Sequence, residues 1–463
     1  MRTKISIVNR FWMSATLVLL VVWVGASAAV AQEGEGVAAR VERALVLIRE
    51  NRVAEAEQQL SSVLKVAPNE ASALNLLGAI RAQQARFGEA ETLFARAVRS
   101  DPQFVGAHMN LAYLYLLKGL PEKTVAELKE VVRLDPNHAE ATYKLARLLL
   151  SQNRVDECIG FVEKVKQSQT VPAALLVVLG DAYRSRGDFD KAEANYLLAL
   201  DAQSNNTDAS LGLAEVARSR GDARNVSLYL ARAKNSAVAS PELLYKYALV
   251  ALGSGLYEEA NVALLSAVEH RPDEPSFLLA LGATWLKKPD LIEAERVFRR
   301  FLKLLPDDAR GQMYLGYVLL KQKKYAEARE WLERSVKTDT SMPEAFYYLA
   351  LIAQEQNEDA RAVELLEKVV GRLPAYTHAH VALGASYMKM KNYVRARESL
   401  ELAVRLNPEE PKAHYNLAML FARLKDQQRS QEHMRIVERL KNRNAATAQD
   451  TDAPAHTVSP NPL

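Results

Sequence analysis

The sequence predicts an all-α solenoid of about twelve helix-turn-helix repeats, and three observations support this fold class. From Val37 onward, a period of 34 residues fits twelve consecutive units without insertion or deletion. Within each unit the apolar residues follow helical spacing in two separate segments. The composition is 49% hydrophobic and 25% charged, with 17 Pro and 19 Gly in 463 residues. Such a composition is typical of a folded, largely helical protein.

The first residues have the order of an export signal. Basic residues precede an apolar stretch that starts at residue 11, and the small residues Ala-Val-Ala end it at residue 31. This order predicts a signal peptide that is cleaved before Gln32. The alternative is an uncleaved inner-membrane anchor, because residues 11–31 are just long enough to span a bilayer. In both cases we expect the body beyond the inner membrane, periplasmic or secreted if the source is bacterial.

The sequence divides the chain into four segments. Residues 1–31 are the signal peptide or anchor, 32–36 a short linker, 37–444 the twelve repeats, and 445–463 a tail. The tail is rich in Ala, Thr, Asp and Pro. We expect it to be disordered, because it carries too little apolar surface to pack.

The columns of the repeat alignment have physical meaning. Position 8 is Gly or Ala in every unit, as two closely crossing helices require. Position 24 is large and apolar, and Pro at position 32 ends the second helix in most units. The units begin at Val37, Ala71, Val105, Ala139, Ala173, Thr207, Pro241, Pro275, Ala309, Pro343, Thr377 and Pro411.

These columns resemble the tetratricopeptide repeat (TPR) family over about nine-tenths of the chain. The family's Trp at position 4 is absent, and the sixth unit departs at Ala223, Arg224 and Val226. We expect softer packing or a local change of curvature in that unit. The resemblance implies a right-handed superhelix whose first helices line a concave groove. The family pattern is carried most fully by Leu74, Leu77, Gly78, Ala90, Phe94, Ala97 and Pro102, and again by Leu278, Leu281, Gly282, Trp285, Ala294, Phe298 and Pro306.

By this resemblance, positions 2, 5, 6, 9, 12 and 13 of each unit face the groove. A tyrosine there offers a large apolar contact and a polar tip, which suits the capture of a protein segment. We expect four tyrosines of the ninth and tenth units to anchor such a segment; the alternative is that they only pack against neighbouring repeats. The predicted partner-binding residues are Asn110, Tyr113, Tyr314, Tyr317, Tyr347, Tyr348, Tyr415 and Asn416.

Basic residues recur at position 13 of four of the last five units, as Lys287, Lys321, Lys389 and Arg423. Such a line could meet an acidic tail of a partner. The favoured interpretation is a solvated face, because the paired Asn and Lys/Arg clamp of some family members is not reproduced.

Several functions are excluded by what the sequence lacks. The net charge of +4 lies largely in the first ten residues, so the body has no basic face for nucleic acid. His108, His380 and His414 have no neighbours at metal-ligand spacing and are expected to pack rather than bind metal. Cys158 is the single cysteine and reads as a small buried residue. No phosphate loop, nucleophile elbow or zinc-protease helix occurs, so no cofactor and no catalysis are expected.

The expected function is a non-enzymatic scaffold or adaptor of the cell envelope that binds other proteins in the groove. Membrane contact is expected only through the N-terminal segment, if it is not cleaved. Two alternatives remain open: a glycan-binding or polysaccharide-export accessory protein, and a regulatory subunit of an envelope enzyme.

Overall fold

A computed structural model describes residues 36–168, 171–237 and 240–450 of the chain. In these ranges the chain forms 24 helices, paired in order as twelve helix-turn-helix repeats, which confirms the predicted fold class. None of the helices in these ranges is both long and apolar enough to cross a membrane. The predicted signal peptide or anchor and residues 451–463 of the predicted tail lie outside the described residues.

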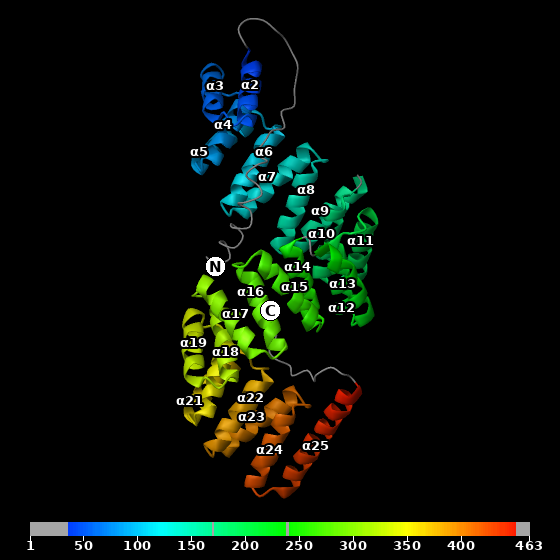
Figure 1. Cartoon of the computed structure of the whole chain (residues 1–463), viewed down its shortest axis with the longest axis vertical. Coiled ribbons are helices and arrows are strands. Elements are labelled where there is room, and N and C mark those ends of the chain that lie inside the picture. The colour runs from blue at the N-terminus through cyan, green and yellow to red at the C-terminus, as the bar shows by residue number, and fades with distance from the viewer. Residues whose placement is uncertain (1–35, 169–170, 238–239, 451–463) are drawn as a thin grey trace. The chain divides into compact units, whose positions relative to one another are not determined.

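The chain separates into two compact units, of which the first extends to Ala233. Each repeat has a first and a second helix, packed as a pair (Figure 1). The helices of this unit are α2 (Val37–Arg49), α3 (Val53–Val66), α4 (Ala71–Gln83), α5 (Phe87–Ser100), α6 (Val105–Leu117), α7 (Pro121–Leu134), α8 (Ala139–Ser151), α9 (Val155–Ser168), α10 (Ala173–Arg186), α11 (Phe189–Ala202), α12 (Thr207–Ser219) and α13 (Ala223–Ala237), within which the division falls.

The second unit begins at Lys234. Its helices are α14 (Pro241–Gly253), α15 (Tyr257–His270), α16 (Pro275–Lys287), α17 (Leu291–Leu304), α18 (Ala309–Lys321), α19 (Tyr325–Thr338), α20 (Pro343–Glu355), α21 (Asp359–Arg372), α22 (Thr377–Lys389), α23 (Tyr393–Leu406), α24 (Pro411–Arg423) and α25 (Gln427–Asp450). The last helix continues to Asp450, so residues 445–450, which the sequence assigned to the disordered tail, are helical.

The first helix of every repeat begins at the residue where the alignment starts a unit, from Val37 in α2 to Pro411 in α24. The turn to the second helix has a left-handed residue at position 15 in eleven of the twelve units. The exception is Pro289, whose ring fixes a negative φ. The left-handed residues are Asn51, Ala85, Gly119, Asn153, Gly187, Gly221, Gly255, Lys323, Asn357, Lys391 and Lys425.

The small residues of the first helices let aromatic rings of the second helices approach their backbones. A Cβ added at Gly180 would lie 2.6 Å from the ring of Tyr196. A Cβ added at Gly212, in the first helix of the next repeat, would also overlap the same ring. A Cβ added at Gly282 would likewise lie 2.6 Å from the ring of Phe298. Repeats therefore pack through rings seated on glycines, as close helix crossing requires.

Position 4, where the family has Trp, carries a polar side chain in seven repeats, and in four of them it donates a hydrogen bond to the carbonyl of the Pro six residues earlier. This bond satisfies a carbonyl in the turn after the preceding second helix. The histidines at this position therefore act in repeat packing. The pairs are His108 with Pro102 (3.2 Å), Gln312 with Pro306 (2.7 Å), His380 with Pro374 (2.8 Å) and His414 with Pro408 (3.0 Å).

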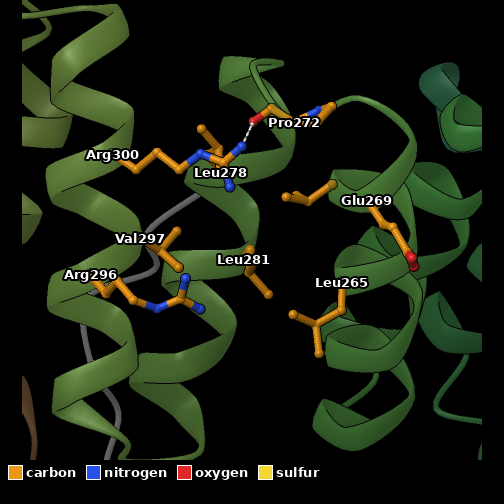
Figure 2. Close-up of a pocket in the computed structure, with 9 residues that line it drawn as sticks. Leu265, Glu269, Pro272, Leu278, Leu281, Arg296, Val297 and Arg300 are labelled. Atoms are coloured by element: carbon orange, nitrogen blue, oxygen red, sulfur yellow. Dashed lines mark hydrogen bonds between the residues drawn. The ribbon is translucent and has the colours of Figure 1, made fainter.

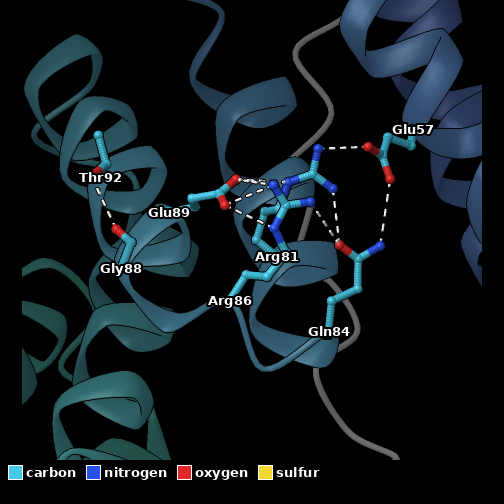
Figure 3. A network of polar contacts seen from close by, with 7 residues as sticks. All are labelled: Glu57, Arg81, Gln84, Arg86, Gly88, Glu89 and Thr92. Atoms are coloured by element: carbon cyan, nitrogen blue, oxygen red, sulfur yellow. Dashed lines mark hydrogen bonds and ion pairs between the residues drawn. The ribbon is translucent and has the colours of Figure 1, made fainter.

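A polar network joins the first two repeats (Figure 3). Arg81 in α4, whose side chain is 12% exposed, lies 2.5 Å from a carboxylate oxygen of Glu57 in α3 and 3.3 Å from one of Glu89 in α5. Arg86 also pairs with Glu89, at 2.7 Å. The hydrogen bond from Arg81 holds the pKa of Glu57 below its ordinary value. Charged side chains thus supplement the apolar stack at this junction.

Candidate functional site

Five aromatic side chains of the second unit form a continuous chain of ring contacts, called here the aromatic array. The ring centroids of Tyr317 and Tyr348 are 4.7 Å apart, those of Tyr348 and Tyr347 5.7 Å, and those of Tyr347 and Tyr376 5.3 Å. His378 continues the chain 6.0 Å from Tyr376. These are ordinary distances for interacting aromatic pairs. The array joins α18, α20 and α22, the first helices of three successive repeats.

Repeat geometry explains how the array forms. Tyr317 comes from position 9 of its repeat, and Tyr347 and Tyr348 from positions 5 and 6 of the next. Tyr376 lies in the turn before α22, where its N–H donates to the carbonyl of Leu373 (3.1 Å). Tyr376 is not among the predicted residues, because position 34 is outside the helical groove positions. Its place immediately before a first helix is the signal that could have found it.

The four predicted tyrosines differ in how much surface they offer. Tyr314 and Tyr348 are each 6% exposed. Tyr314 stacks on Phe298 of the preceding repeat, with centroids 5.2 Å apart and planes 15° from parallel, and is not part of the array. Tyr317 and Tyr347 are half-buried. Tyr314 therefore packs against the preceding repeat, whereas Tyr317 and Tyr347 keep surface that a partner could contact. Partner binding stays a prediction for all four tyrosines.

The hydroxyl groups of the array are held in their neutral form. Burial, and then the charge of Glu410, raise the pKa of Tyr347 to about 12. Burial and neighbouring tyrosines and Glu344 also raise the pKa of Tyr348 and Tyr376. The hydroxyl oxygen of Tyr376 is buried and has no hydrogen-bond partner within the described ranges. The array therefore presents aromatic faces and neutral donors.

Two predicted residues of the first unit lie in internal contacts. Asn110 donates to the side-chain oxygen of Asn75 in the preceding repeat (2.8 Å). The hydroxyl of Tyr113 donates to Glu140 (2.5 Å), and the ammonium of Lys144 lies 5.0 Å from the centre of the Tyr113 ring. These residues form a polar patch across successive first helices, in a different unit from the array.

Tyr415 and Asn416 lie in α24. Tyr415 is 47% exposed and Asn416 is half-buried. No ring contact among the described residues joins Tyr415 to the aromatic array. The structure thus brings together three of the eight predicted residues, Tyr317, Tyr347 and Tyr348, in one array.

The basic residues at position 13 are partly used within the repeat stack. Lys389 donates to the carbonyl of Gln354 (3.2 Å), and Arg423 donates to that of Met388 (3.4 Å). Both carbonyls belong to the last turn of the preceding first helix, where a cation is favoured. Lys389 also pairs with Asp359 (3.6 Å). Contacts within the repeat stack therefore account for these two charges without an acidic tail of a partner protein.

A separate pocket of about 380 Å³ lies among α15, α16 and α17 (Figure 2). Arg300 donates there to the carbonyl of Pro272 (2.5 Å), and Arg296 pairs with Glu293 (2.5 Å). Both arginines are therefore engaged by the protein itself. In the ranges that the structure describes, no group of three or more His, Cys, Asp or Glu side chains could hold a metal ion. The pocket is lined by Leu265, Val268, Glu269, Pro272, Leu278, Leu281, Arg296, Val297 and Arg300.

Models of known protein families match the repeats of this chain. Two family models, both described as tetratricopeptide repeat, match residues 41–103, 177–225, 290–343 and 351–420, together about half of the chain. A third, described as anaphase-promoting complex, cyclosome, subunit 3, matches residues 83–165.

Curated relatives match parts of the chain. Protein O-mannosyl-transferase TMTC3 of Mus musculus is 26% identical over 52% of this chain and 28% of its own length. Cellulose synthase operon protein C of Pseudomonas fluorescens (strain SBW25) is 26% identical over 47% of this chain and 18% of its own length. TPR repeat-containing protein YpiA of Bacillus subtilis (strain 168) is 24% identical over 38% of this chain and 42% of its own length. The chain spans less than half the length of each.

Among solved structures, the APC/C hetero-tetramer Cut9-Hcn1 aligns over 83% of this chain and 96% of its own chain, at 12% identity and a TM-score of 0.43. Pseudomonas aeruginosa pilF aligns over 46% of this chain and 98% of its own, at 21% identity and a TM-score of 0.40.

Proposed function

Because this chain belongs to the tetratricopeptide repeat family, we propose that it is a non-enzymatic scaffold of the cell envelope that binds segments of partner proteins. The observation that supports this proposal most directly is the aromatic array. Half-buried tyrosines on consecutive first helices provide large, rigid contacts that lose little entropy when a partner binds. Stacked repeats extend such a surface along the chain, so one molecule can hold a long segment or several.

We also propose that residues 1–31 direct export. The support is the order of basic, apolar and small residues in that segment. Mass spectrometry of the native protein should find an N-terminus at Gln32. An intact N-terminus in the membrane fraction would favour the anchor, and an intact N-terminus in the cytosol would contradict export.

Partner binding is tested by crosslinking in intact source cells, followed by affinity capture and mass spectrometry. The informative variant is Tyr347→Ala/Tyr376→Ala, because both rings are half-buried, whereas replacing the buried Tyr314 or Tyr348 would also disturb the core. We expect partners captured by the wild type to be lost at least about tenfold in this variant, as the removal of anchor residues implies.

The matched control is Tyr393→Ala. Tyr393 is also half-buried but begins the second helix α23. Its removal should leave capture unchanged, with both variants retaining wild-type helicity by circular dichroism. Equal capture by wild type and the Tyr347/Tyr376 variant would move the binding site away from the array.

A second candidate is a polysaccharide-associated accessory protein. It is favoured by the partial similarity to cellulose synthase operon protein C, 26% identical over 47% of this chain, and by the ability of tyrosine rings to stack against sugars. Binding of isolated soluble glucan to the purified protein, lost in the Tyr347/Tyr376 variant, would support this candidate over the protein scaffold.

A further inference from the structure

The aromatic array has an acidic end. Glu344 precedes Tyr347 by three residues and Tyr348 by four in α20, so the three side chains share one face of the helix. Glu410 occupies the turn before α24, one repeat beyond the equivalent turn residue Tyr376. The carboxylate of Glu410 lies 3.7 Å from Nδ1 of His378, the last ring of the array, and Glu344 shares a helix face with Tyr347 and Tyr348, so both carboxylates lie at this end of the array.

Neither carboxylate lies close to a lysine or arginine side chain in the part of the protein that the structure describes. Glu410 is 8% exposed, and its nearest basic group among the described residues is His378, with Nδ1 3.7 Å from the carboxylate. It also accepts a hydrogen bond from the backbone N–H of Lys412 (3.2 Å). The carboxylate of Glu344 makes no hydrogen bond or ion pair with any described residue. A buried carboxylate without a cation is costly, and a bound cation would offset that cost.

The two ends of the array differ in their own cations. At one end, the ammonium of Lys321 lies 5.4 Å from the centre of the Tyr317 ring. At the other end lies the imidazole of His378, whose ring centre is 6.0 Å from that of Tyr376, and no lysine or arginine of the described chain lies over the ring of Tyr347 or Tyr376. Aromatic faces attract cations, so the end beside the two carboxylates is the one left open to a cation from outside.

We propose that Tyr347, Tyr348 and Tyr376, together with the carboxylates of Glu344 and Glu410, form a cage for one arginine or lysine side chain of a partner protein. The inference rests on the proposed scaffold function and gives it a partner chemistry. Tyr376 would contribute the face of its ring to the cage, because its hydroxyl oxygen is buried. A neutral sugar would leave both carboxylates without a counter-charge.

To test the cage, binding peptides are selected from a random library displayed on phage, with the purified full-length protein as the target. A selected peptide is then compared by calorimetry with an analogue in which citrulline replaces the arginine, or norleucine the lysine. We expect the selected peptides to share a basic residue at one position. The neutral analogue should bind the wild-type protein about tenfold more weakly than the basic peptide does, which is the effect expected from losing a desolvated cation–π contact and a paired charge.

The decisive variant is Glu344→Gln/Glu410→Gln, which keeps side-chain shape and an oxygen that can accept from Lys412 N–H. This variant should bind the basic peptide about tenfold more weakly than the wild type does. It should bind the neutral analogue with nearly the same affinity as it binds the basic peptide, because the change in the protein and the change in the peptide remove the same interaction. The control Glu355→Gln alters a carboxylate of the same helix that contacts Tyr325 (3.4 Å) instead of the array. It should bind like the wild type.

Four outcomes overturn the cage. Selected peptides without a basic residue, or equal affinity for the peptide and its neutral analogue, would leave the scaffold standing and reject the cation. Equal binding by the Glu344/Glu410 variant would place the cation elsewhere. If no peptide is selected and a soluble glucan binds instead, both the cage and the protein scaffold are rejected.

Discussion

At the residue scale, the absence of a Cβ atom at a glycine decides how closely two repeats approach each other. The ring of Tyr196 is fully buried, and its hydroxyl donates to Asp181 (2.7 Å). Gly180 and Gly212 lie against this ring from consecutive first helices. Because the ring is fully buried and fixed at its hydroxyl group, it cannot move aside for an added methyl group.

We predict that Gly180→Ala destabilises the protein by about 1–3 kcal/mol through overpacking, although Ala favours a helix by about 1 kcal/mol over Gly. The control is Gly160→Ala in α9, where an added Cβ has nothing within 4 Å. That change should stabilise by about 0.5–1 kcal/mol. Urea unfolding followed by circular dichroism measures both, and the same sign for the two changes would contradict the packing account.

At the element scale, two histidines join α24 to the last helix, α25. Nε2 of His414 donates to the carbonyl of Pro408, so its Nδ1 must accept in the 2.9 Å contact with Nδ1 of His433. His433 is therefore the donor, in the tautomer that this network requires. Its ring also stacks on Phe421, with centroids 5.7 Å apart.

The histidine pair predicts that acid weakens the attachment of α25. Burial and the neighbouring His414 lower the pKa of His433 below 6.5, with Arg429 in the same direction and Glu432 and Glu401 opposing. A histidine with a lowered pKa contributes stability above its unfolded value, and this contribution is lost as pH falls through the folded value. Protection of α25 amides from hydrogen exchange should therefore fall several-fold from about pH 7.5 to about pH 5.

The control for this prediction is His433→Gln, which keeps a donor and does not titrate. Its protection should change less over the same pH range than that of the wild type. An identical decrease in both proteins would assign the acid effect to other groups.

His108 predicts the opposite dependence in the first unit. Its two nitrogens face Glu127 (2.7 Å) and the Pro102 carbonyl (3.2 Å), neither of which can donate. The bond to Glu127, above all, raises the pKa of His108 above 6.5. Its contribution is present below the unfolded pKa and lost as pH rises through the folded one. His108→Gln should thus lower the melting temperature at about pH 6 more than at about pH 9; an equal decrease would contradict the charged pair.

The helices could be predicted from the sequence more completely than the aromatic array could. Period and Pro positions located the first residue of every first helix, from Val37 to Pro411, because steric and packing constraints act locally and repeat. Burial of Tyr314 depends on Phe298, a residue of the preceding repeat, and Tyr376 joins the array from a turn. Such contacts depend on how neighbouring repeats stack, which one repeat's pattern does not specify.

At the scale of the whole molecule, the chain divides at Ala233, within α13. This helix belongs to the sixth repeat, whose pattern is weakened at Ala223, Arg224 and Val226. In a solenoid each repeat is stabilised mainly by its neighbours, so a weakly packed repeat limits how far cooperativity extends. The division therefore falls in the repeat where the sequence predicts soft packing.

We predict that the two units unfold as separate cooperative blocks. Calorimetry should give a van't Hoff enthalpy well below the calorimetric enthalpy, which signals more than one transition. Gly180→Ala, in the first unit, should lower the melting temperature of one transition only. Gly282→Ala, which sets a Cβ 2.6 Å from the Phe298 ring in the second unit, should lower the other.

The two variants also distinguish this account from a single cooperative array. If coupling through the sixth repeat were as strong as elsewhere, either substitution would lower one common transition, and the two enthalpies would agree. Separate responses would mean that a partner bound at the aromatic array stabilises only the second unit. The first unit, with its own patch at Asn110 and Tyr113, would then be free to respond to a different partner.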